Sequence, residues 1–361
     1  MKKLEPSIEI EIDEKKIGNK NPVYFIAEIG SNFDCDLQRA KDLIYMAKDA
    51  GADAAKFQHY TADSLVSDYG FKKIINSNSH QSQWDKSVYD TYEEASINQD
   101  WTGILQETCK DANLSFLTSP YSINLVDYVD PFVPAYKVGS GDITWLEIIE
   151  HIASKGKPIL LATGASELID VKRAVDVILS ITSDLILLQC NTNYTSSCNN
   201  FAHLQLNVIT EYQKLYPGVI TGLSDHTQGH VSVLGAVALG AKVIEKHFTD
   251  STNRVGPDHS FSMTPVTWLE MVERTRELED ALGDGHKKVE ENEIETAILQ
   301  RRSICSVKKL NLGDKIQKHD LEVLRPCPKN GIDPSDMVSV IGKTLNKNIK
   351  VGEHLKWSDF D

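Results

Sequence analysis

Short apolar runs alternate with longer amphipathic stretches over most of the chain, beginning near residue 23. The first run covers residues 23–29, a helical pattern follows over 36–50, and the second run covers 54–58. The same alternation predicts further strands at residues 114–118, 135–138, 158–162 and 185–190 and at the starts of 222–230 and 243–248, with helices at 99–112, 124–129, 145–155, 168–179, 204–216, 231–240 and 266–282. Near-continuous apolar strands between amphipathic helices indicate a parallel sheet that is buried on both faces.

Eight strand-and-helix units in about 260 residues fit a closed (β/α)8 barrel, the TIM barrel. An open doubly wound sheet is the alternative, but no Gly-x-Gly-x-x-Gly motif follows the first strand. We therefore predict an α/β protein with a TIM barrel over residues 23–283.

Three segments depart from this rhythm. Residues 7–17 alternate apolar and charged positions before Gly18 and Asn19, which predicts an N-terminal β-hairpin within 1–22 that plugs the bottom of the barrel. Residues 59–98 form a polar insertion with scattered aromatic residues, and a loop of this length is typical of a lid or binding loop. After Gly283 a charged linker, 284–300, leads to a small domain over 301–361 that is rich in Gly and Pro.

Composition and charge narrow the function classes. The 361 residues carry a formal net charge of −14, which argues against a nucleic-acid surface, so an anionic substrate would need a local basic pocket. The six cysteines form no C-x-x-C pair, and the chain has no apolar leader and no apolar run long enough to cross a membrane. We expect a reduced, cytoplasmic location without membrane contact.

Two histidines stand at corresponding places on the last two predicted strands. His226 and His247 each follow a short apolar run. An isolated histidine in such a place is more often a helix cap or a core residue, but the carboxyl ends of neighbouring parallel strands meet at one face of a barrel. The sequence therefore predicts a two-histidine metal site.

Other strand ends carry cations and donors. Lys56 and Lys137 lie inside otherwise apolar runs, where a buried lysine requires a counter-charge from a phosphate, a carboxylate or the nearby Glu28. The serines at strand ends could cap helices or could donate to phosphate oxygens; they are Ser119, Ser140 and Ser224. By itself Asp258 is typical of a turn residue. Together these groups favour a lyase or transferase that acts on a phosphorylated anion, with a metal polarising a carbonyl.

The chain resembles the sialic acid synthase family from about residue 22 to its end. Seven motifs in the same order carry the resemblance: AEIGSN at 27–32, AKFQ at 55–58, FLTSPYS at 116–122, YKVGSGD at 136–142, GLSDHT at 222–227, EKHFT at 245–249 and GPDHSFS at 256–262. The segment from Arg301 onward resembles the antifreeze-like (SAF) domain that closes these enzymes.

The resemblance implies an enzyme that condenses phosphoenolpyruvate with an N-acetylated hexose, giving a sialic-acid-like nonulosonate and phosphate. A manganese-type ion, with magnesium or cobalt as alternatives, would be held by His226 and His247, and Glu28 would orient a water or the attacking group. Phosphoenolpyruvate would be bound by residues matching Lys56, Lys137, Ser119, Ser140 and Ser224. The sugar would be bound by residues matching Gln58, Asp142, Tyr194 and Asp258. In a domain-swapped homodimer, Arg325 of the partner would contact its acyl group.

Two departures from the family pattern bear on the sugar. Residues 191–195 read NTNYT, without the proline that usually follows the tyrosine, and Ala162 stands where many members have serine. N-acetylmannosamine, its 6-phosphate and a di-N-acetylated dideoxy hexose all stay open as substrates. The alternatives are a related synthase that takes a phosphorylated aldose, a Schiff-base aldolase using Lys56 or Lys137, and a carbohydrate-binding barrel without turnover.

Overall fold

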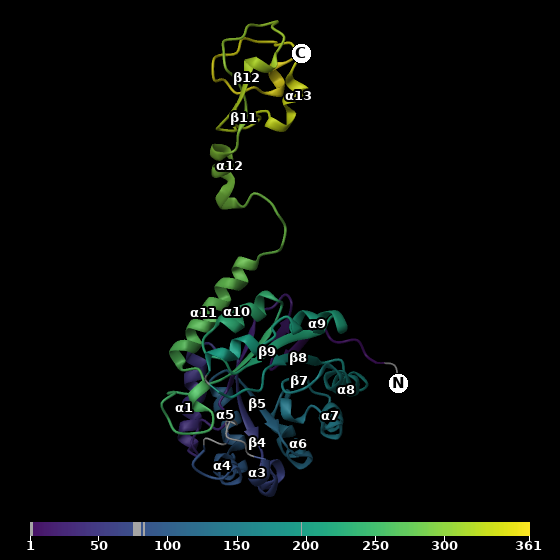
Figure 1. The fold of residues 1–361 in the computed structure, drawn as a ribbon, viewed down its shortest axis with the longest axis vertical. Coiled ribbons are helices and arrows are strands. Elements are labelled where there is room, and N and C mark those ends of the chain that lie inside the picture. Colours follow the sequence, from purple (N-terminus) through teal and green to yellow (C-terminus); the bar gives the residue numbers. More distant parts are fainter. Residues whose placement is uncertain (1–2, 75–80, 82–83, 196) are drawn as a thin grey trace. The chain divides into compact units, whose positions relative to one another are not determined.

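A computed structural model describes residues 3–74, 81, 84–195 and 197–361 of the chain (Figure 1). Contacts divide the chain into two compact units, Met1–Gly283 and Asp284–Asp361, and each unit is described by itself. The segment 284–300, predicted as a linker, falls within the second unit. Among the described residues, no helix has the length and apolar character needed to cross a membrane.

The first unit is a closed barrel of eight parallel strands, as predicted. The strands are β3 (Tyr24–Glu28), β4 (Ala54–His59), β5 (Ser115–Pro120), β6 (Tyr136–Val138), β7 (Ile159–Ala162), β8 (Leu185–Cys190), β9 (Ile220–Asp225) and β10 (Val243–His247). β10 pairs with both β9 and β3, and the pairing of His247 with Glu28 closes the ring. Because every strand runs the same way, all the carboxyl ends meet at one mouth.

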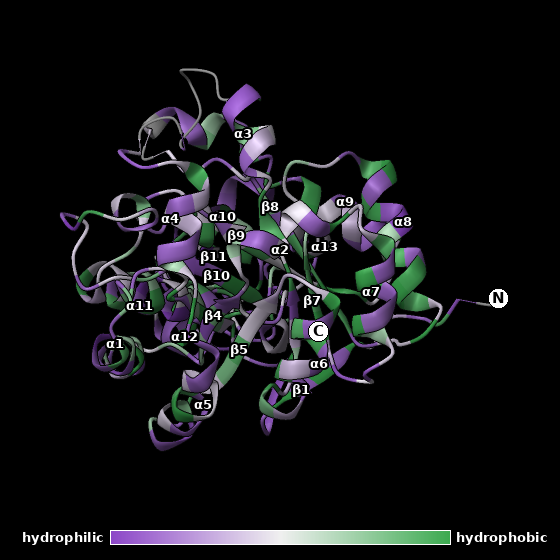
Figure 2. Ribbon diagram, turned by 90° about the horizontal axis from the view of Figure 1, so that it is seen from below, coloured by the Kyte–Doolittle hydropathy of each residue, from purple (hydrophilic) through white to green (hydrophobic). Residues whose placement is uncertain are grey.

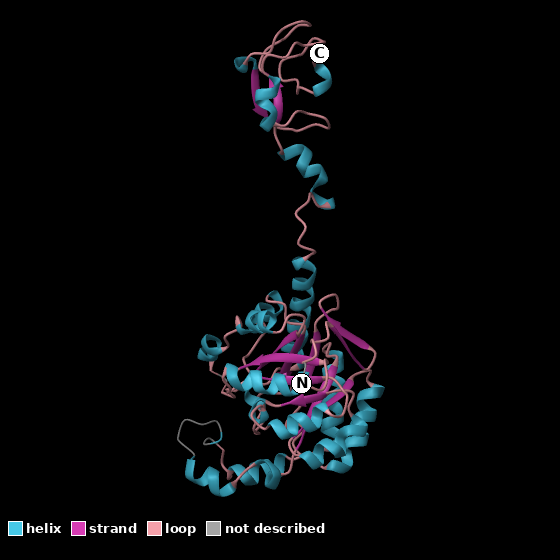
Figure 3. Cartoon of the chain, turned by 90° about the vertical axis from the view of Figure 1, so that its right-hand side faces the viewer, coloured by secondary structure: helices cyan, strands magenta, loops and turns pink. Residues whose placement is uncertain are grey.

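Helices surround the barrel, as Figure 3 shows. They are α1 (Leu37–Asp49), α5 (Thr102–Asp111), α6 (Ile123–Val129), α7 (Leu146–Ala153), α8 (Leu168–Leu179), α9 (Val208–Leu215), α10 (Val231–Ala238) and α11 (Pro265–Leu282). Hydrophobic and hydrophilic residues alternate along α7 and α8 in Figure 2, and α7 buries Ile148, Ile149 and Ile152 against the strands. The sequence periodicity predicted amphipathic helices of this kind.

One predicted helix boundary is wrong. The helix expected at residues 204–216 begins only at Val208 and is preceded by a 3-10 helix, Cys198–His203. The backbone of Gln205 has a φ of 50°, in the left-handed region that a continuous helix cannot include. Apolar spacing alone carries no sign of such a break.

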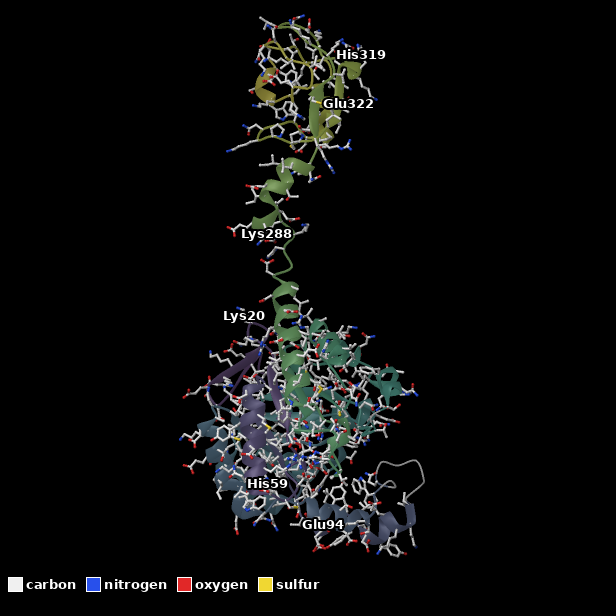
Figure 4. The ribbon with its side chains drawn as sticks, turned by 90° about the vertical axis from the view of Figure 1, so that its left-hand side faces the viewer. Lys20, His59, Glu94, Lys288, His319 and Glu322 are labelled. Carbon is white, nitrogen blue, oxygen red and sulfur yellow. The ribbon has the colours of Figure 1, made fainter. Side chains whose placement is uncertain are left out.

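The N-terminal hairpin closes the barrel at the end opposite to the mouth. β1 (Glu9–Ile12) and β2 (Lys15–Gly18) are antiparallel and bury Ile10, Ile12 and Ile17 in the same cluster as residues that begin the barrel strands. Figure 4 shows Lys20, just after the hairpin, toward one end of the unit and His59, at the end of β4, toward the other. The predicted plug is therefore present.

The insertion at 59–98 is more structured than the long loop that the sequence predicted. Its described part contains α2 (Ala62–Leu65), α3 (Asp68–Ile74) and α4 (Val88–Ala95), while 75–80 and 82–83 lie outside the described residues. These helices are short, and apart from Ala62 and Val88 they bury none of their own residues, so their sequence shows little helical periodicity.

The second unit has a small core of its own. It contains α12 (Ile294–Gln300), the antiparallel strands β11 (Ser303–Ser306) and β12 (Leu321–Leu324), and α13 (Met337–Val340). Ile304, Ile316, Leu345, Ile349 and Leu355 are buried together in it. Arg325 directly follows β12 and is exposed.

Candidate active site

The carboxyl ends of the strands surround a cavity of about 400 Å³. Twelve of the thirteen residues predicted for the site line it: Glu28, Lys56, Gln58, Ser119, Lys137, Ser140, Asp142, Tyr194, Ser224, His226, His247 and Asp258. The thirteenth, Arg325, belongs to the second unit. The strand-end positions therefore converge as predicted, whereas the role of Arg325 stays a prediction.

The alternation of side chains along each strand selects which residues reach the cavity. On β4, Lys56 and Gln58 face the cavity, while Phe57 between them packs in the outer core. On β10, Glu245 and His247 face the cavity, and Lys246 between them points away. Because successive side chains of a strand point to opposite faces, residues that line the cavity alternate with residues that point away from it.

Two lysines and two glutamates form a buried charge cluster at the floor of the cavity. Lys56 is paired with Glu28, and Lys137 Nζ lies 3.1 Å from Glu245 Oε1. Lys56 Nζ also lies 3.9 Å from that Glu245 oxygen, and Ser224 donates to the same atom at 3.2 Å. Each lysine therefore has a protein counter-charge before any anion binds. Glu28 plays the structural partner role that the sequence left open.

The two glutamates have different proton affinities. Burial raises the pKa of Glu28 to about 7, with Glu245 adding to the rise and Lys56 opposing it. Burial would also raise the pKa of Glu245, but Lys137 and Lys56 outweigh it and the pKa is lowered. Glu245 is therefore the fixed negative charge of the cluster, and Glu28 can take up or release a proton near neutral pH.

The three serines differ in their bonding. Ser119 lies within β5 and Ser224 within β9, so neither caps a helix. Ser119 accepts a hydrogen bond from Lys56 Nζ at 3.4 Å, and Ser140 accepts one from the Gly164 N–H at 2.9 Å. All three hydroxyls lie beside the charge cluster or a glycine turn, which suits the binding of anionic oxygens.

His226 and His247 lie side by side, with ring centroids 5.4 Å apart. The Nδ1–H of His226 donates to the Asn191 carbonyl at 2.9 Å, which leaves Nε2 as the nitrogen available to a ligand. Tyr194 packs against both rings, with centroid distances of 4.5 Å and 6.4 Å. This tyrosine, predicted to bind sugar, lies directly beside the histidines.

The pKa values of the two histidines shift in opposite directions. Burial lowers the pKa of His247 well below its usual value, and the positive charges of His226 and Lys56 lower it further. Burial would lower the pKa of His226 too, but Cys190 and the Asn191 carbonyl outweigh it and the pKa is raised. His247 is therefore held in the neutral form that binds metals.

The donor set fits a metal ion that is shared with substrate. Nδ1 of His247 is buried and makes no hydrogen bond among the described residues, and Oδ2 of Asp258 lies 3.6 Å from it. No group of three or more His, Cys, Asp or Glu side chains in the described part of the chain is placed to hold a metal by itself. Two imidazoles would therefore leave several positions open for water or substrate oxygens.

Asp258 is more than the turn residue that its sequence context suggested. Gly30, at φ +51°, lies so close that a Cβ there would come within 3.0 Å of Asp258 Oδ2 and 2.8 Å of Glu28 Oε1. The glycine thus lets two carboxylates approach each other. Asp142 also faces the cavity, and burial raises its pKa to about 6.

Sequence reasoning missed several residues that line the cavity. Glu245 stands two positions before His247, so strand alternation could have identified it, and Cys190 is the last residue of β8. Trp84 and Tyr92 come from the insertion, where only scattered aromatic residues gave a signal. Tyr121 follows β5 directly.

Behind the histidines, a buried ion pair joins the tips of β9 and β10. Lys246 Nζ contacts Asp225 Oδ2 at 2.5 Å and also donates to the Thr227 carbonyl, while Ser232 donates to the same carboxylate. Burial would raise the pKa of Asp225, but Lys246 outweighs it and the pKa is lowered. The pair therefore ties together the two strand ends that carry His226 and His247.

Replacing Lys246 with methionine should destabilise the barrel unit by about 3–5 kcal/mol, because it leaves the Asp225 carboxylate buried without its cation. Chemical denaturation followed by circular dichroism measures the change. Lys72→Met is the matched control, since Lys72 is exposed and pairs with Asp68 one helical turn away; its denaturation midpoint should equal that of the wild type. Equal midpoints for all three proteins would contradict the structural role of Lys246.

Comparison with known protein families identifies both units of the chain. Residues 43–287, more than half of the chain, match the NeuB family. The chain belongs to the NeuB family. Residues 301–361 match the SAF domain, which confirms the resemblance seen in the sequence.

The NeuB-family relatives align over nearly the whole chain. The N,N'-diacetyllegionaminic acid synthase of Legionella pneumophila is 33% identical over 96% of this chain and 97% of its own. The human N-acetylneuraminate-9-phosphate synthase is 31% identical over 91% of this chain and 90% of its own. A crystal structure of N-acetylneuraminic acid synthetase from Leptospira borgpetersenii is similar with a TM-score of 0.70 and 28% identity, over 81% of this chain and 96% of that one.

Proposed function

We propose that this NeuB-family chain is a nonulosonate synthase, a transferase that forms a carbon–carbon bond between phosphoenolpyruvate and an N-acetylated hexose. The observation that carries the proposal is the charge cluster of Lys56, Lys137, Glu28 and Glu245, which shares one cavity with His226 and His247. An anion site beside a metal-competent site matches a reaction between a phosphorylated anion and a carbonyl compound.

The floor of the cavity would bind phosphoenolpyruvate. Lys56 and Lys137 supply positive charge, and the hydroxyls of Ser119, Ser140 and Ser224 supply donors. Because Glu245 stays ionised, it holds both ammonium groups in place while the substrate's phosphate and carboxylate approach them. Positioning of the two reactants accounts for much of the rate acceleration in such a site.

The wall nearest the histidines would bind the aldose. Gln58 is oriented by a hydrogen bond to Glu28 Oε1 at 2.8 Å, and Asp142, Tyr194 and Asp258 line the same cavity. A divalent ion, which we propose to be manganese with magnesium or cobalt as alternatives, would be held by His226 and His247 and would polarise the aldose carbonyl when bound.

The bond changes balance without a further reactant. The methylene carbon of phosphoenolpyruvate bonds to the aldehyde carbon, whose oxygen takes a proton and becomes a hydroxyl. Water then adds to the carbon that carries the phosphate, and cleavage of the C–O bond releases inorganic phosphate and leaves a keto group. Glu28, with a pKa of about 7, can accept the proton that the water loses.

The test is aldose-dependent release of phosphate. Purified chain is mixed with manganese, N-acetylmannosamine or a di-N-acetylated deoxy hexose, and phosphoenolpyruvate carrying ¹⁸O in the bridging C–O bond. We expect phosphate to appear only with an aldose and to retain the label, and mass spectrometry should find the condensed nine-carbon acid. Sugar binding without phosphate release would favour a carbohydrate-binding barrel instead.

We expect neither Lys56 nor Lys137 to form an imine with substrate. A Schiff-base lysine needs a depressed pKa. Burial would lower the pKa of Lys56, but Glu245 and Glu28 outweigh it and the pKa is raised. Borohydride added during turnover should therefore leave the mass of the chain unchanged, and a stable adduct mapped to either lysine would favour the aldolase alternative.

A further inference from the structure

The insertion between β4 and α5 builds one side of the cavity from apolar groups. Nine of its described residues line the cavity, and seven of these are aliphatic or aromatic. Tyr60 directly follows β4, and we refer to the other six as the insertion wall: Leu65, Val66, Phe71, Trp84, Tyr92 and Ala95. The charged residues described above come instead from the ends of the strands and the loops that follow them.

Aromatic contacts hold the insertion wall against the barrel. The ring of Tyr92 lies 5.5 Å from Tyr60 and 5.9 Å from Trp84, and Tyr60 lies 6.0 Å from Tyr121. Tyr60 and Tyr121 belong to the segments that directly follow β4 and β5. The rings therefore form a continuous surface from the strand ends to α4, which is a preformed apolar surface for a ligand.

The insertion wall supplies no cation. Lys72, Lys73 and Lys86 are the lysines of the insertion, and none of them lines this cavity. Lys72 pairs with Asp68 and Lys86 pairs with Glu94, both at exposed positions. By sequence, the segments 75–80 and 82–83, which lie outside the described residues, contain no lysine or arginine and a single histidine, His80.

The lysines and the arginine that line this cavity and a neighbouring one are paired with carboxylates. A second cavity shares Trp84 and Ala95 with the first and includes Lys86 and Arg254. Lys86 is held by Glu94, and Arg254 is held by Asp250 at 2.8 Å. In the first cavity, Lys56 and Lys137 are bound by glutamates and are the groups that phosphoenolpyruvate would use.

We propose that the hexose substrate carries no phosphate and turns an apolar group toward the insertion wall, such as the methyl of a second acetamido group or a deoxy carbon. This inference rests on the proposed synthase function and narrows its substrate class. A phosphate at the same place would lose its hydration against aromatic rings while Asp142 and Asp258 face the same cavity. An acetyl or deoxy methyl would instead gain burial against Tyr92, Trp84 and Phe71.

The experiment compares three aldoses with the full-length chain, phosphoenolpyruvate and manganese. They are a di-N-acetylated deoxy hexose, N-acetylmannosamine and N-acetylmannosamine 6-phosphate, and product is measured by mass spectrometry. We expect kcat/KM for the first to exceed that for N-acetylmannosamine by about 10- to 100-fold, the discrimination that one apolar group gains in an apolar pocket. For the 6-phosphate it should be on the order of 100-fold below N-acetylmannosamine, because its charge finds no partner at the wall.

A pair of variants on α3 tests whether the insertion wall is responsible. Phe71→Lys places a cation on the wall and should raise kcat/KM for the 6-phosphate relative to N-acetylmannosamine by roughly 10-fold. Ile74→Lys is the matched control, since Ile74 lies on the same helix, is 74% exposed and does not line the cavity. It should leave the ratio at the wild-type value.

The outcomes separate this inference from the function on which it rests. If the wild type uses the 6-phosphate as well as N-acetylmannosamine, the inference is overturned while the synthase function stands. If the two α3 variants have the same ratio, or the di-N-acetylated sugar shows no advantage, the wall does not select the substrate and the inference is likewise overturned. If no aldose releases phosphate, the proposed function fails and the inference fails with it.

Discussion

Alanine at either His226 or His247 should reduce turnover by about 1,000-fold or more while the barrel remains folded, since a lost carbonyl-polarising site is worth several kcal/mol of transition-state stabilisation. The two rings lie at strand tips, with centroids 5.4 Å apart, and line the cavity rather than the hydrophobic core. Loss of one imidazole would leave the proposed metal ion with a single protein ligand, so bound metal should fall together with activity. Elemental analysis, circular dichroism and phosphate release measured on the same samples provide the three readouts.

His230→Ala is the matched control for this prediction. His230 lies four residues after His226, at the start of α10, and does not line the cavity. Its variant should keep wild-type metal content and activity. Unchanged metal stoichiometry and activity in the His226 or His247 variant would rule out the two-histidine site.

Removal of the second unit should leave a folded barrel that has largely lost sugar-dependent turnover. The barrel unit ends at Gly283 and has its own core, and the SAF unit has a separate core around Ile304 and Leu355. A chain truncated after Gly285 should therefore still bind metal and phosphoenolpyruvate, because the residues proposed to bind them lie at the ends of the barrel strands. We expect kcat/KM for the aldose to fall by roughly 100-fold or more, since the acyl contact that the family resemblance implies for Arg325 would be lost. Calorimetric binding of phosphoenolpyruvate and steady-state kinetics of the aldose separate the two effects.

Mixed dimers test whether Arg325 acts across subunits. If it does, pairing an Arg325→Ala subunit with a His226→Ala subunit leaves one intact site per heterodimer, so a fully exchanged mixture should recover up to about a quarter of wild-type activity. A tail that closes its own barrel would leave both sites damaged in every mixed dimer. Subunit exchange is followed by native mass spectrometry, and Arg302→Ala, which removes another exposed arginine of the same unit, serves as the control and should retain full activity. Exchange without recovery would refute the crossed arrangement.

The fold was largely predictable because its signals are local. Apolar runs such as 185–190 coincide with β8, and runs at 54–58 and 243–248 differ from β4 and β10 by one residue. The rule that carboxyl ends of parallel strands share one mouth then placed Lys56, Lys137 and His226 together, although long stretches of sequence separate them. The start of α9 was missed because it depends on one left-handed residue, Gln205, rather than on periodicity.

By itself, the order of polar residues at strand ends determined which side chains reach the cavity, because side-chain direction in a strand repeats every two residues. Which charges pair inside the barrel was decided only by the tertiary structure. Glu245 meets Lys137, which lies 108 residues earlier in the chain, and this contact lowers the pKa of Glu245 while that of Glu28 rises to about 7. The insertion wall likewise exists only once Tyr92 and Trp84 pack against residues that follow β4 and β5. Strand periodicity can be read within one segment of the sequence. Electrostatic partners and ring contacts depend instead on distances between segments across the closed barrel. Those distances are fixed only when β10 pairs with β3 and closes the barrel.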